Sequence, residues 1–346
     1  MRKTEKQPLP LPFPHAKIET FQANLLAWFA SSHRKMPWRD KPSLYATVIS
    51  EFMLQQTQFE TARPYFERWI TRWPDFASLA AATETEVVKS WEGLGYYNRA
   101  RNLHKLATRI ASMPAPPRTT TDWLSLPGVG NYTAAAITSI AFNEPAAVVD
   151  GNVIRVLARL TAQTHEFKDT TTAAKHLAPL AQKLLTRSTP GTHNQAMMEL
   201  GALVCLRQKP RCLLCPVSQF CAATATDNPS NIPRFKPRPI KKLTQKRIWL
   251  LHNDKLLLHR HSPNARRLRN LYELPPAEHL LPNPAPETII ARKRRAISNQ
   301  QIEETIYLAT WTPPLETHIR TTPSLLWVPQ PYQPTPTQKR PPPKMI

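Results

Sequence analysis

At residues 126–137 the sequence reads LPGVGNYTAAAI, with a proline and two glycines directly ahead of a run of small residues. Proline and glycine between two helical patterns predict a tight hairpin, and the run that follows predicts a helix. The first turn of such a helix presents free backbone N–H groups and the positive end of its dipole, which together suit a phosphate. The pattern therefore predicts a phosphate contact at Gly128 and Gly130, with an ordinary turn as the alternative.

Twenty residues beyond Gly130 an apolar run ends in an aspartate, in the stretch VVDGNVIRV at residues 148–156. Aspartate is a preferred N-cap, so the simplest interpretation of Asp150 is structural. A carboxylate at a helix N-terminus is also stabilised in its ionised form. Its position shortly after the hairpin makes Asp150 a candidate catalytic residue as well.

Helical periodicity extends over most of the first two-thirds of the chain. Apolar residues recur at helical spacing from Ile18 onward, and all seven glycines lie between Gly93 and Gly201. We therefore expect a helical domain over residues 15–225, with nearly all of these apolar positions in its core.

The four cysteines lie within seventeen residues, at Cys205, Cys212, Cys215 and Cys221. In a reducing compartment, clustered cysteines are more often metal ligands than disulfides. Four thiolates fit either a tetrahedral zinc or a four-iron, four-sulfur cluster. Zinc modules usually pair two Cys-x2-Cys knuckles, and only one is present here. The spacing therefore favours one [4Fe-4S] cluster, with zinc as the alternative.

The composition changes after Cys221. Residues 226–244 are polar, basic and proline-rich, which indicates a linker. In residues 245–330, the stretch IWLLHNDKLLLHRH predicts two strands around an Asn-Asp turn and ETIYLATW predicts another, so we expect a small α+β domain. Residues 331–346 are proline-rich and predict a disordered tail.

The net charge predicts a polyanionic partner. The chain carries 46 Lys and Arg against 24 Asp and Glu, a formal charge of +22. Nucleic acid is the first candidate and an anionic membrane the rival, but no stretch approaches the roughly 18 apolar residues of a membrane span. The charged, proline-rich N-terminus does not resemble a secretory signal. We expect a protein that is not secreted and binds nucleic acid in the cytoplasm, at the nucleoid.

Together, the hairpin, Asp150 and the Cys-x6-Cys-x2-Cys-x5-Cys spacing resemble the helix-hairpin-helix DNA glycosylase superfamily, which includes endonuclease III. Within it, SEFMLQQTQ (50–58), GLGYY (93–97), DGN (150–152) and NQAMMELG (194–201) resemble the adenine DNA glycosylases. That family removes adenine mispaired with 8-oxoguanine or guanine in duplex DNA, in base excision repair. The resemblance implies an all-α helix-hairpin-helix glycosylase domain with an iron-sulfur cluster loop (205–221), and a small C-terminal α+β domain of degenerate Nudix-like type.

The resemblance assigns the chemistry to two carboxylates. Cleavage of an N-glycosidic bond needs an acid for the leaving base and negative charge beside the oxocarbenium-like sugar. Glu51 would protonate the adenine, with its pKa raised by burial, and Asp150 would face the sugar as an anion. Tyr132 occupies the position of the lysine nucleophile of bifunctional relatives, and a phenol cannot form an imine, which predicts a monofunctional hydrolase. Tyr132 and Asn152 are expected to hydrogen-bond Asp150 or the sugar.

The remaining site residues also follow from the resemblance, because the target base must leave the duplex. The residues expected to wedge beside the opposite base are Gln56, Thr57, Leu94 and Tyr96. Those expected to line the adenine pocket are Arg34, Trp38, Arg39 and Glu199. For Trp38 and Tyr96 core packing is the alternative.

The C-terminal domain departs from the family pattern. Where the family commonly has Phe-Ser-His, this chain has Ile297-Ser298-Asn299, so that Ser298 alone matches. We expect this domain to act mainly as a basic clamp on the DNA backbone. The alternatives for the whole protein are an endonuclease III-like glycosylase for another damaged base, a catalytically silent DNA-binding protein, and a zinc-stabilised DNA-binding module.

Overall fold

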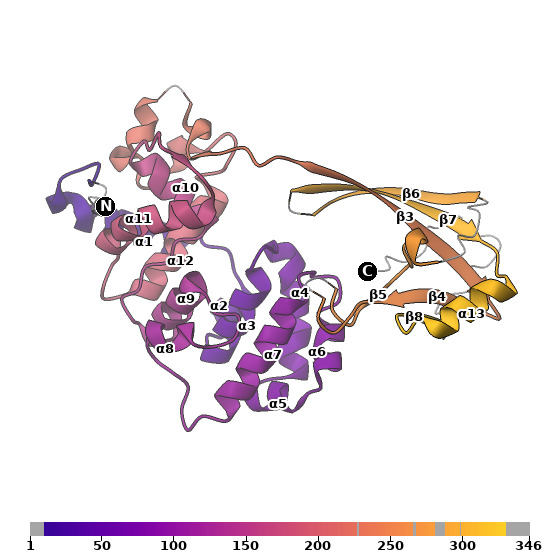
Figure 1. Ribbon diagram of the computed structural model, residues 1–346. Coiled ribbons are helices and arrows are strands. Elements are labelled where there is room, and N and C mark those ends of the chain that lie inside the picture. Colours follow the sequence, from indigo (N-terminus) through magenta and orange to yellow (C-terminus); the bar gives the residue numbers. More distant parts are fainter. Residues whose placement is uncertain (1–9, 227, 266–267, 281–287, 298, 330–346) are drawn as a thin grey trace, which may run out of the picture. The chain divides into compact units, whose positions relative to one another are not determined.

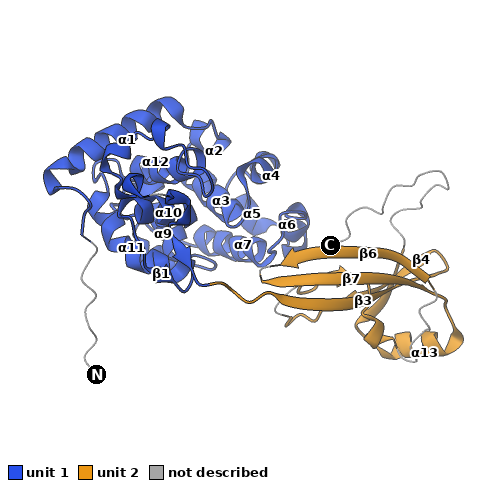
Figure 2. Ribbon diagram, turned by 90° about the horizontal axis from the view of Figure 1, so that it is seen from above, with its two compact units in different colours: residues 1–236 blue, residues 237–346 orange. Residues whose placement is uncertain are grey.

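The computed structural model describes residues 10–226, 228–265, 268–280, 288–297 and 299–329. The chain divides into two compact units, residues 1–236 and 237–346 (Figure 2). The predicted proline-rich tail and Ser298 lie outside the described residues. Within the described ranges, no helix combines the length and the apolar character that are needed to cross a bilayer.

The first unit is built almost entirely of helices (Figure 1). They are α1 (Ile18–Ser32), α2 (Pro37–Asp40), α3 (Leu44–Leu54), α4 (Phe59–Arg72), α5 (Phe76–Ala81), α6 (Glu84–Ser90), α7 (Asn98–Ala111), α8 (Thr120–Leu124), α9 (Asn131–Phe142), α10 (Gly151–Leu160), α11 (Thr170–Leu184) and α12 (Pro190–Leu203). The 3-10 turns are η1 (His15–Lys17), η2 (Cys212–Leu214), η3 (Ser218–Phe220), η4 (Ala222–Ala225) and η5 (Pro229–Asn231). The predicted helical domain is confirmed.

Local sequence determines where many of these helices begin. A side-chain oxygen of the N-cap residue accepts a hydrogen bond from a backbone N–H of the first turn at Ser43, Asp75, Thr83, Thr119, Asp150 and Asp169. Such a cap contributes about 1 kcal/mol. The main core lies where α10 packs against α11 and α12, with Leu157, Leu177 and Leu200 fully buried. α10, which Asp150 caps, is therefore anchored along its length.

The predicted hairpin joins α8 to α9. The Val129 N–H donates to the Leu126 carbonyl at 3.3 Å, and Gly128 has a φ of +76°, a left-handed conformation that favours glycine. A Cβ atom on Gly128 would also lie 2.6 Å from Cβ of Asn102, on α7. The Gly130 carbonyl accepts the first helical hydrogen bond of α9, from Ala134 at 2.9 Å. The hairpin and the helix that follows are confirmed.

The second unit is a mixed sheet with one described α-helix, which confirms the α+β class. Its elements are β3 (Lys241–His252), β4 (Lys255–Arg260), β5 (Tyr272–Glu273), η6 (Ala277–His279), β6 (Thr288–Ile297), β7 (Gln300–Ala309), α13 (Pro313–Thr321) and β8 (Leu325–Pro329). The strand order is β5-β4-β3-β7-β6, with β8 paired to β4. Asn253 and Asp254 both have positive φ, as a tight two-residue hairpin requires, so the predicted Asn-Asp turn between two strands is confirmed.

The segment predicted as a linker, residues 226–244, contains η5, β2 and the start of β3. β2 (Arg234–Phe235) pairs in parallel with β1 (Glu166–Phe167), and the Lys236 N–H donates to the Phe167 carbonyl at 2.9 Å. The rings of Phe235 and Phe167 lie 6.0 Å apart. The sheet of the second unit already begins at Lys241. Backbone pairing to β1 attaches β2 to the helical unit. The local composition gives no sign of this pairing.

Replacement of Gly128 by alanine tests the hairpin. Because alanine at a positive φ is strained and its Cβ would meet Asn102, we expect Gly128→Ala to lower the free energy of unfolding by about 2 to 4 kcal/mol. Gly130→Ala is the matched control, since Gly130 has no atom within 4 Å of an added Cβ, and it should cost no more than about 1 kcal/mol. Urea unfolding followed by helical circular dichroism measures both. Equal losses would contradict the account.

Candidate active site

A cavity of about 800 Å³ opens in the helical unit, and both candidate carboxylates line it. Its wall is formed by residues of α1 to α4, α9, α10 and α12 and their connections. It brings together nine of the predicted site residues, namely Arg34, Trp38, Arg39, Glu51, Thr57, Tyr132, Asp150, Asn152 and Glu199. These residues are up to 165 positions apart in the sequence.

Glu51 lies on α3 and is only 6% exposed. Burial, which disfavours a charged carboxylate, raises its pKa to about 7, and the nearby charge of Asp150 adds to the rise, while the Tyr132 hydroxyl and Arg39 oppose it. The Oε2 atom is buried without a hydrogen-bond partner. A carboxyl group in this environment can hold a proton near neutral pH and has an oxygen free to deliver it.

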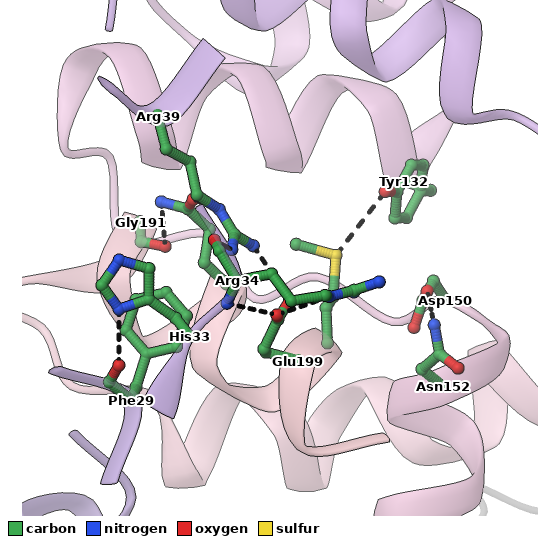
Figure 3. Close-up of polar contacts among 11 residues, drawn as sticks. Phe29, His33, Arg34, Arg39, Tyr132, Asp150, Asn152, Gly191 and Glu199 are labelled. Atoms are coloured by element: carbon green, nitrogen blue, oxygen red, sulfur yellow. Dashed lines mark hydrogen bonds and ion pairs between the residues drawn. The ribbon is translucent and has the colours of Figure 1, made fainter. Parts of the chain in front are cut away.

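Asp150 is surrounded by hydrogen-bond donors. Its Oδ1 accepts from the backbone N–H of Val153 at 2.7 Å, and its Oδ2 accepts from Nδ2 of Asn152 at 3.1 Å (Figure 3). Burial raises the pKa of Asp150, and these donors, together with the charge of Arg155, act in the opposite direction. The helix N-terminus therefore does not by itself determine the protonation of Asp150. Both carboxylate oxygens of Asp150 nevertheless have partners, whereas Oε2 of Glu51 has none.

Tyr132, on α9, interacts electrostatically with both carboxylates, Glu51 and Asp150. Burial and the charges of Glu51 and Asp150 raise its pKa well above the ordinary value, so the phenol stays protonated. Its hydroxyl donates to Sδ of Met198 at 3.6 Å (Figure 3) and contacts the Glu51 carboxyl. Tyr132 is thus placed to orient Glu51, whereas Asn152 makes the hydrogen bond to Asp150.

A second wall of the cavity carries a carboxylate between two guanidinium groups (Figure 3). Glu199, 1% exposed, accepts from the backbone N–H of Arg34 at 2.9 Å and from its Nε at 2.7 Å, and from Nη2 of Arg39 at 3.2 Å. Burial alone would raise the pKa of Glu199, but the hydrogen bonds and charges of the two arginines outweigh it and lower the pKa. This wall therefore presents rigid, planar hydrogen-bond donors to the cavity.

The residues expected to contact the opposite base lie on two loops. Gln56 and Tyr96 both have positive φ, and Tyr96 is 54% exposed, so core packing, the alternative for Tyr96, is wrong. Leu94 has a buried side chain, 6% exposed. Its carbonyl accepts a hydrogen bond from Nη2 of Arg99 at 3.0 Å. The Thr57 hydroxyl also accepts from Arg99, at 3.0 Å.

Arg99, on α7, was not among the predicted site residues. Its buried guanidinium joins the two loops by donating to Thr57 Oγ1 and to the carbonyls of Phe52, Met53, Gln55, Leu94 and Gly95. Burial lowers its pKa to about 10, which still leaves it charged at neutral pH. In the sequence Arg99 is one of several cations on an amphipathic helix, and only its burial distinguishes it.

Asn194 and Gly201, both on α12, position the approach to Asp150. Asn194 accepts from the Val148 N–H at 3.0 Å and donates to the Ala146 carbonyl at 2.8 Å. A Cβ atom on Gly201 would lie 2.6 Å from Cβ of Asn152, so only glycine permits this contact between α12 and α10. Both residues lie within the quoted NQAMMELG motif, but their positioning roles were not predicted.

The four cysteines surround a small apolar cavity of about 30 Å³. A tetrahedral zinc with Zn–S bonds of 2.3 Å needs sulfur atoms about 3.8 Å apart. Among the described residues, no three of these sulfurs lie within 4.8 Å of one another. The space between them thus suits a cluster larger than one zinc ion.

Two arginines of α10 support this loop. Arg159, 2% exposed, donates to Sγ of Cys205 at 3.3 Å and to the Leu206 carbonyl at 2.6 Å. Arg155 donates to the Cys205 carbonyl at 2.6 Å and to Oδ1 of Asn152 at 2.9 Å. Since Asn152 in turn donates to Asp150, hydrogen bonds connect the cysteine loop to the candidate catalytic aspartate.

Comparison with known proteins agrees with this geometry. Residues 49–183 match the HhH-GPD superfamily of base excision DNA repair proteins. This part of the helical unit is therefore similar to that superfamily. Among solved structures, a thermostable thymine-DNA glycosylase matches 60% of the chain and 96% of its own, with a TM-score of 0.54 and 27% identity. Endonuclease III in a non-covalent DNA complex matches 61% of the chain and 96% of its own, with a TM-score of 0.50 and 23% identity, which supports the fold alone.

The relatives similar in sequence are adenine DNA glycosylases. The chain is 44% identical to the protein of Rattus norvegicus over 236 residues, which is 64% of this chain and 45% of that protein. It is 41% identical to the protein of Mycolicibacterium smegmatis over 198 residues, which is 56% of this chain and 66% of that protein. This chain therefore spans less than half of the rat relative. The similarity to the superfamily and to the adenine DNA glycosylases, both inferred from the motifs, is confirmed.

The pKa of Glu51 predicts how Glu51→Gln changes stability with pH. Below the ordinary pKa of 4.5 the carboxyl is protonated whether the chain is folded or not, so glutamine should have little effect. Between pH 4.5 and about 7, the unfolded chain gains an ionised carboxylate that the fold disfavours, and stability falls by up to about 3 kcal/mol. Glutamine avoids this loss. Melting temperatures should therefore show a much larger stabilising effect of Glu51→Gln at pH 8 than at pH 5; equal effects at both would contradict the shift.

Proposed function

We propose that the protein is a monofunctional adenine DNA glycosylase, which hydrolyses the N-glycosidic bond of adenine opposite 8-oxoguanine or guanine in duplex DNA. The observation that carries the proposal is the pairing of two different carboxyl groups in one cavity. Glu51 is buried with a free oxygen and a pKa of about 7, and Asp150 is held by donors on both oxygens. The similarity to adenine DNA glycosylases supports adenine as the base.

The proposed reaction begins with the adenine flipped out of the duplex into the cavity. Glu51 donates its proton to a ring nitrogen of adenine, the bond between that base and C1′ breaks, and the electron pair leaves with the base. The oxocarbenium-like sugar faces the carboxylate of Asp150. A water molecule then adds its hydroxide to C1′, and its proton passes to the Glu51 carboxylate, which restores the starting state.

The residues around the pair support hydrolysis rather than strand cleavage. Tyr132 stands at the position expected of a lysine nucleophile, and none of the described residues that line the cavity is a lysine. A phenol cannot form the Schiff base that leads to strand cleavage. The donors of Arg34 and Arg39, fixed by Glu199, would orient the base, and Gln56, Thr57, Leu94 and Tyr96 would fill its place in the duplex.

We infer that Cys205, Cys212, Cys215 and Cys221 hold one [4Fe-4S] cluster. The sulfur spacing and the hydrogen bond from Arg159 to Cys205 support this inference. When bound, the cluster would join the four thiolates and fix the loop to α10. Because Arg155 connects the same loop to Asn152, a fixed loop would also help to orient Asp150.

The proposed partner is double-stranded DNA that carries an adenine opposite 8-oxoguanine or guanine. We propose that the protein binds it as a monomer in the cytoplasm, at the nucleoid. The net charge of +22 supports DNA, and two phosphate contacts are proposed in the helical unit, at the hairpin glycines Gly128 and Gly130. In the second unit, Lys242, Arg294 and Arg295 line a hollow of about 590 Å³, which supports a backbone clamp. A degenerate Nudix-like role in inspecting the opposite base, with Ser298, stays a prediction.

The proposal is tested by base release from duplexes with adenine opposite 8-oxoguanine, guanine, cytosine or thymine. Strand breaks should appear only after alkali, and only for the two purine partners. Asp150→Asn should slow release by about 10² to 10⁴-fold. Asp169→Asn is the matched control, because Asp169 caps α11 in the same way, accepting from Thr172 at 2.8 Å, and lies outside the cavity.

Three results would contradict the proposal. Full activity of Asp150→Asn would remove the proposed role of the carboxylate pair. Strand cleavage without alkali would indicate a bifunctional enzyme of the endonuclease III type. No release from any duplex by folded, brown, cluster-loaded protein would leave DNA binding as the function, whereas colourless folded protein would favour zinc in the cysteine loop.

A further inference from the structure

Three metal-binding side chains meet at one edge of the sheet in the second unit. In the antiparallel pair of β4 and β5, His259 lies directly opposite Glu273. His261 follows His259 by two positions, so it projects from the same face. One ligand atom from each of the three residues lies within 4.8 Å of the other two, and no other such group occurs in the part of the chain that the structure describes.

Two nitrogen atoms of this group are buried without hydrogen-bond partners, Nδ1 of His259 and Nε2 of His261. The His261 nitrogen lies 2.9 Å from Oε1 of Glu273, but the two atoms are not oriented as a hydrogen bond. A buried polar atom left unsatisfied costs about 1 to 3 kcal/mol. A cation bound by both nitrogens would satisfy them, with the Glu273 carboxylate as a third ligand.

The hydrogen bonds and ion pairs that surround the three ligands also resemble those around a metal site. Nη1 and Nη2 of Arg247 donate to the two oxygens of Glu273, each at 2.8 Å, and orient the carboxylate. Carboxylates that bind metals are commonly held by such outer hydrogen bonds. Glu304 pairs with Arg247 at 3.3 Å and offsets its charge. The ring of His279, on η6, lies 4.8 Å from that of His259 and is the nearest candidate for a fourth ligand.

We propose that His259, His261 and Glu273 bind one divalent first-row transition ion, zinc above all, with His279 or water as the fourth ligand. Two imidazoles and a carboxylate suit zinc, whereas calcium and magnesium prefer oxygen ligands. The ion would join β4, the two-residue strand β5 and η6. By joining these elements the ion would stabilise the second unit, since a bound metal adds its binding energy to folding.

The test is zinc titration of the full chain, with its cysteine loop already loaded, by isothermal calorimetry and metal analysis. We expect one zinc per chain in addition to the metal of the cysteine loop. His259→Gln and His261→Gln should each weaken binding by more than about tenfold. His252→Gln is the matched control, because the His252 ring stacks on Trp311 at 4.3 Å, outside the group, and should leave binding unchanged.

A second measurement uses the unaltered chain, in case either variant fails to fold. Carbethoxylation followed by mass spectrometry should show zinc protecting His259 and His261 and leaving His252 as reactive as before. The absence of a zinc equivalent beyond the cysteine loop, equal binding by His259→Gln and the unaltered chain, or protection of His252 to the same degree would overturn the proposal. Each of these outcomes is independent of glycosylase activity.

Discussion

The arrangement of the candidate site depends on the burial of Glu51. A carboxylate removed from water loses its hydration, and Arg39 offsets this loss at Glu51 only in part, because both arginines of the cavity pair with Glu199. Glu51 is therefore neutralised most readily by binding a proton, and the pKa of Glu51 rises to about 7. The same cavity gives Asp150 two directed donors. One environment thus separates the two carboxyl groups into an acid and a candidate anion.

The fold maintains this difference by close contacts between helices. Gly128 lets the hairpin pack against α7, and Gly201 lets α12 approach Asn152, so a side chain at either position would displace a wall of the cavity. Buried arginines then connect the loops around it. Arg99 joins the two loops proposed to enter the duplex, and Arg155 joins the cysteine loop to the residues around Asp150. Removal of such a cation leaves several carbonyls unsatisfied, which makes these positions sensitive to substitution.

Much of the helical unit could be predicted because its signals are local. The hairpin glycines, the N-cap at Asp150, and the Asn253-Asp254 turn each follow from a few neighbouring residues. Arg99 and the ordered pairing of β2 could not be predicted, because both depend on contacts with segments far away in the sequence. The protonation of Asp150 was only partly predictable, since a helix N-terminus is visible in the sequence and burial is not. The ligand group at His259 and His261 depends on strand register, which the sequence did not provide.

The central claim is that Glu51 carries a proton near neutral pH because it is buried. Infrared difference spectra between the unaltered protein and Glu51→Gln, recorded across a pH series, would isolate the carbonyl band of the protonated Glu51 carboxyl. The account predicts that this band disappears with a midpoint near the expected pKa of about 7. A midpoint near the ordinary value of 4.5 would contradict it, because Glu51 would then be an anion under the conditions in which it is proposed to donate a proton.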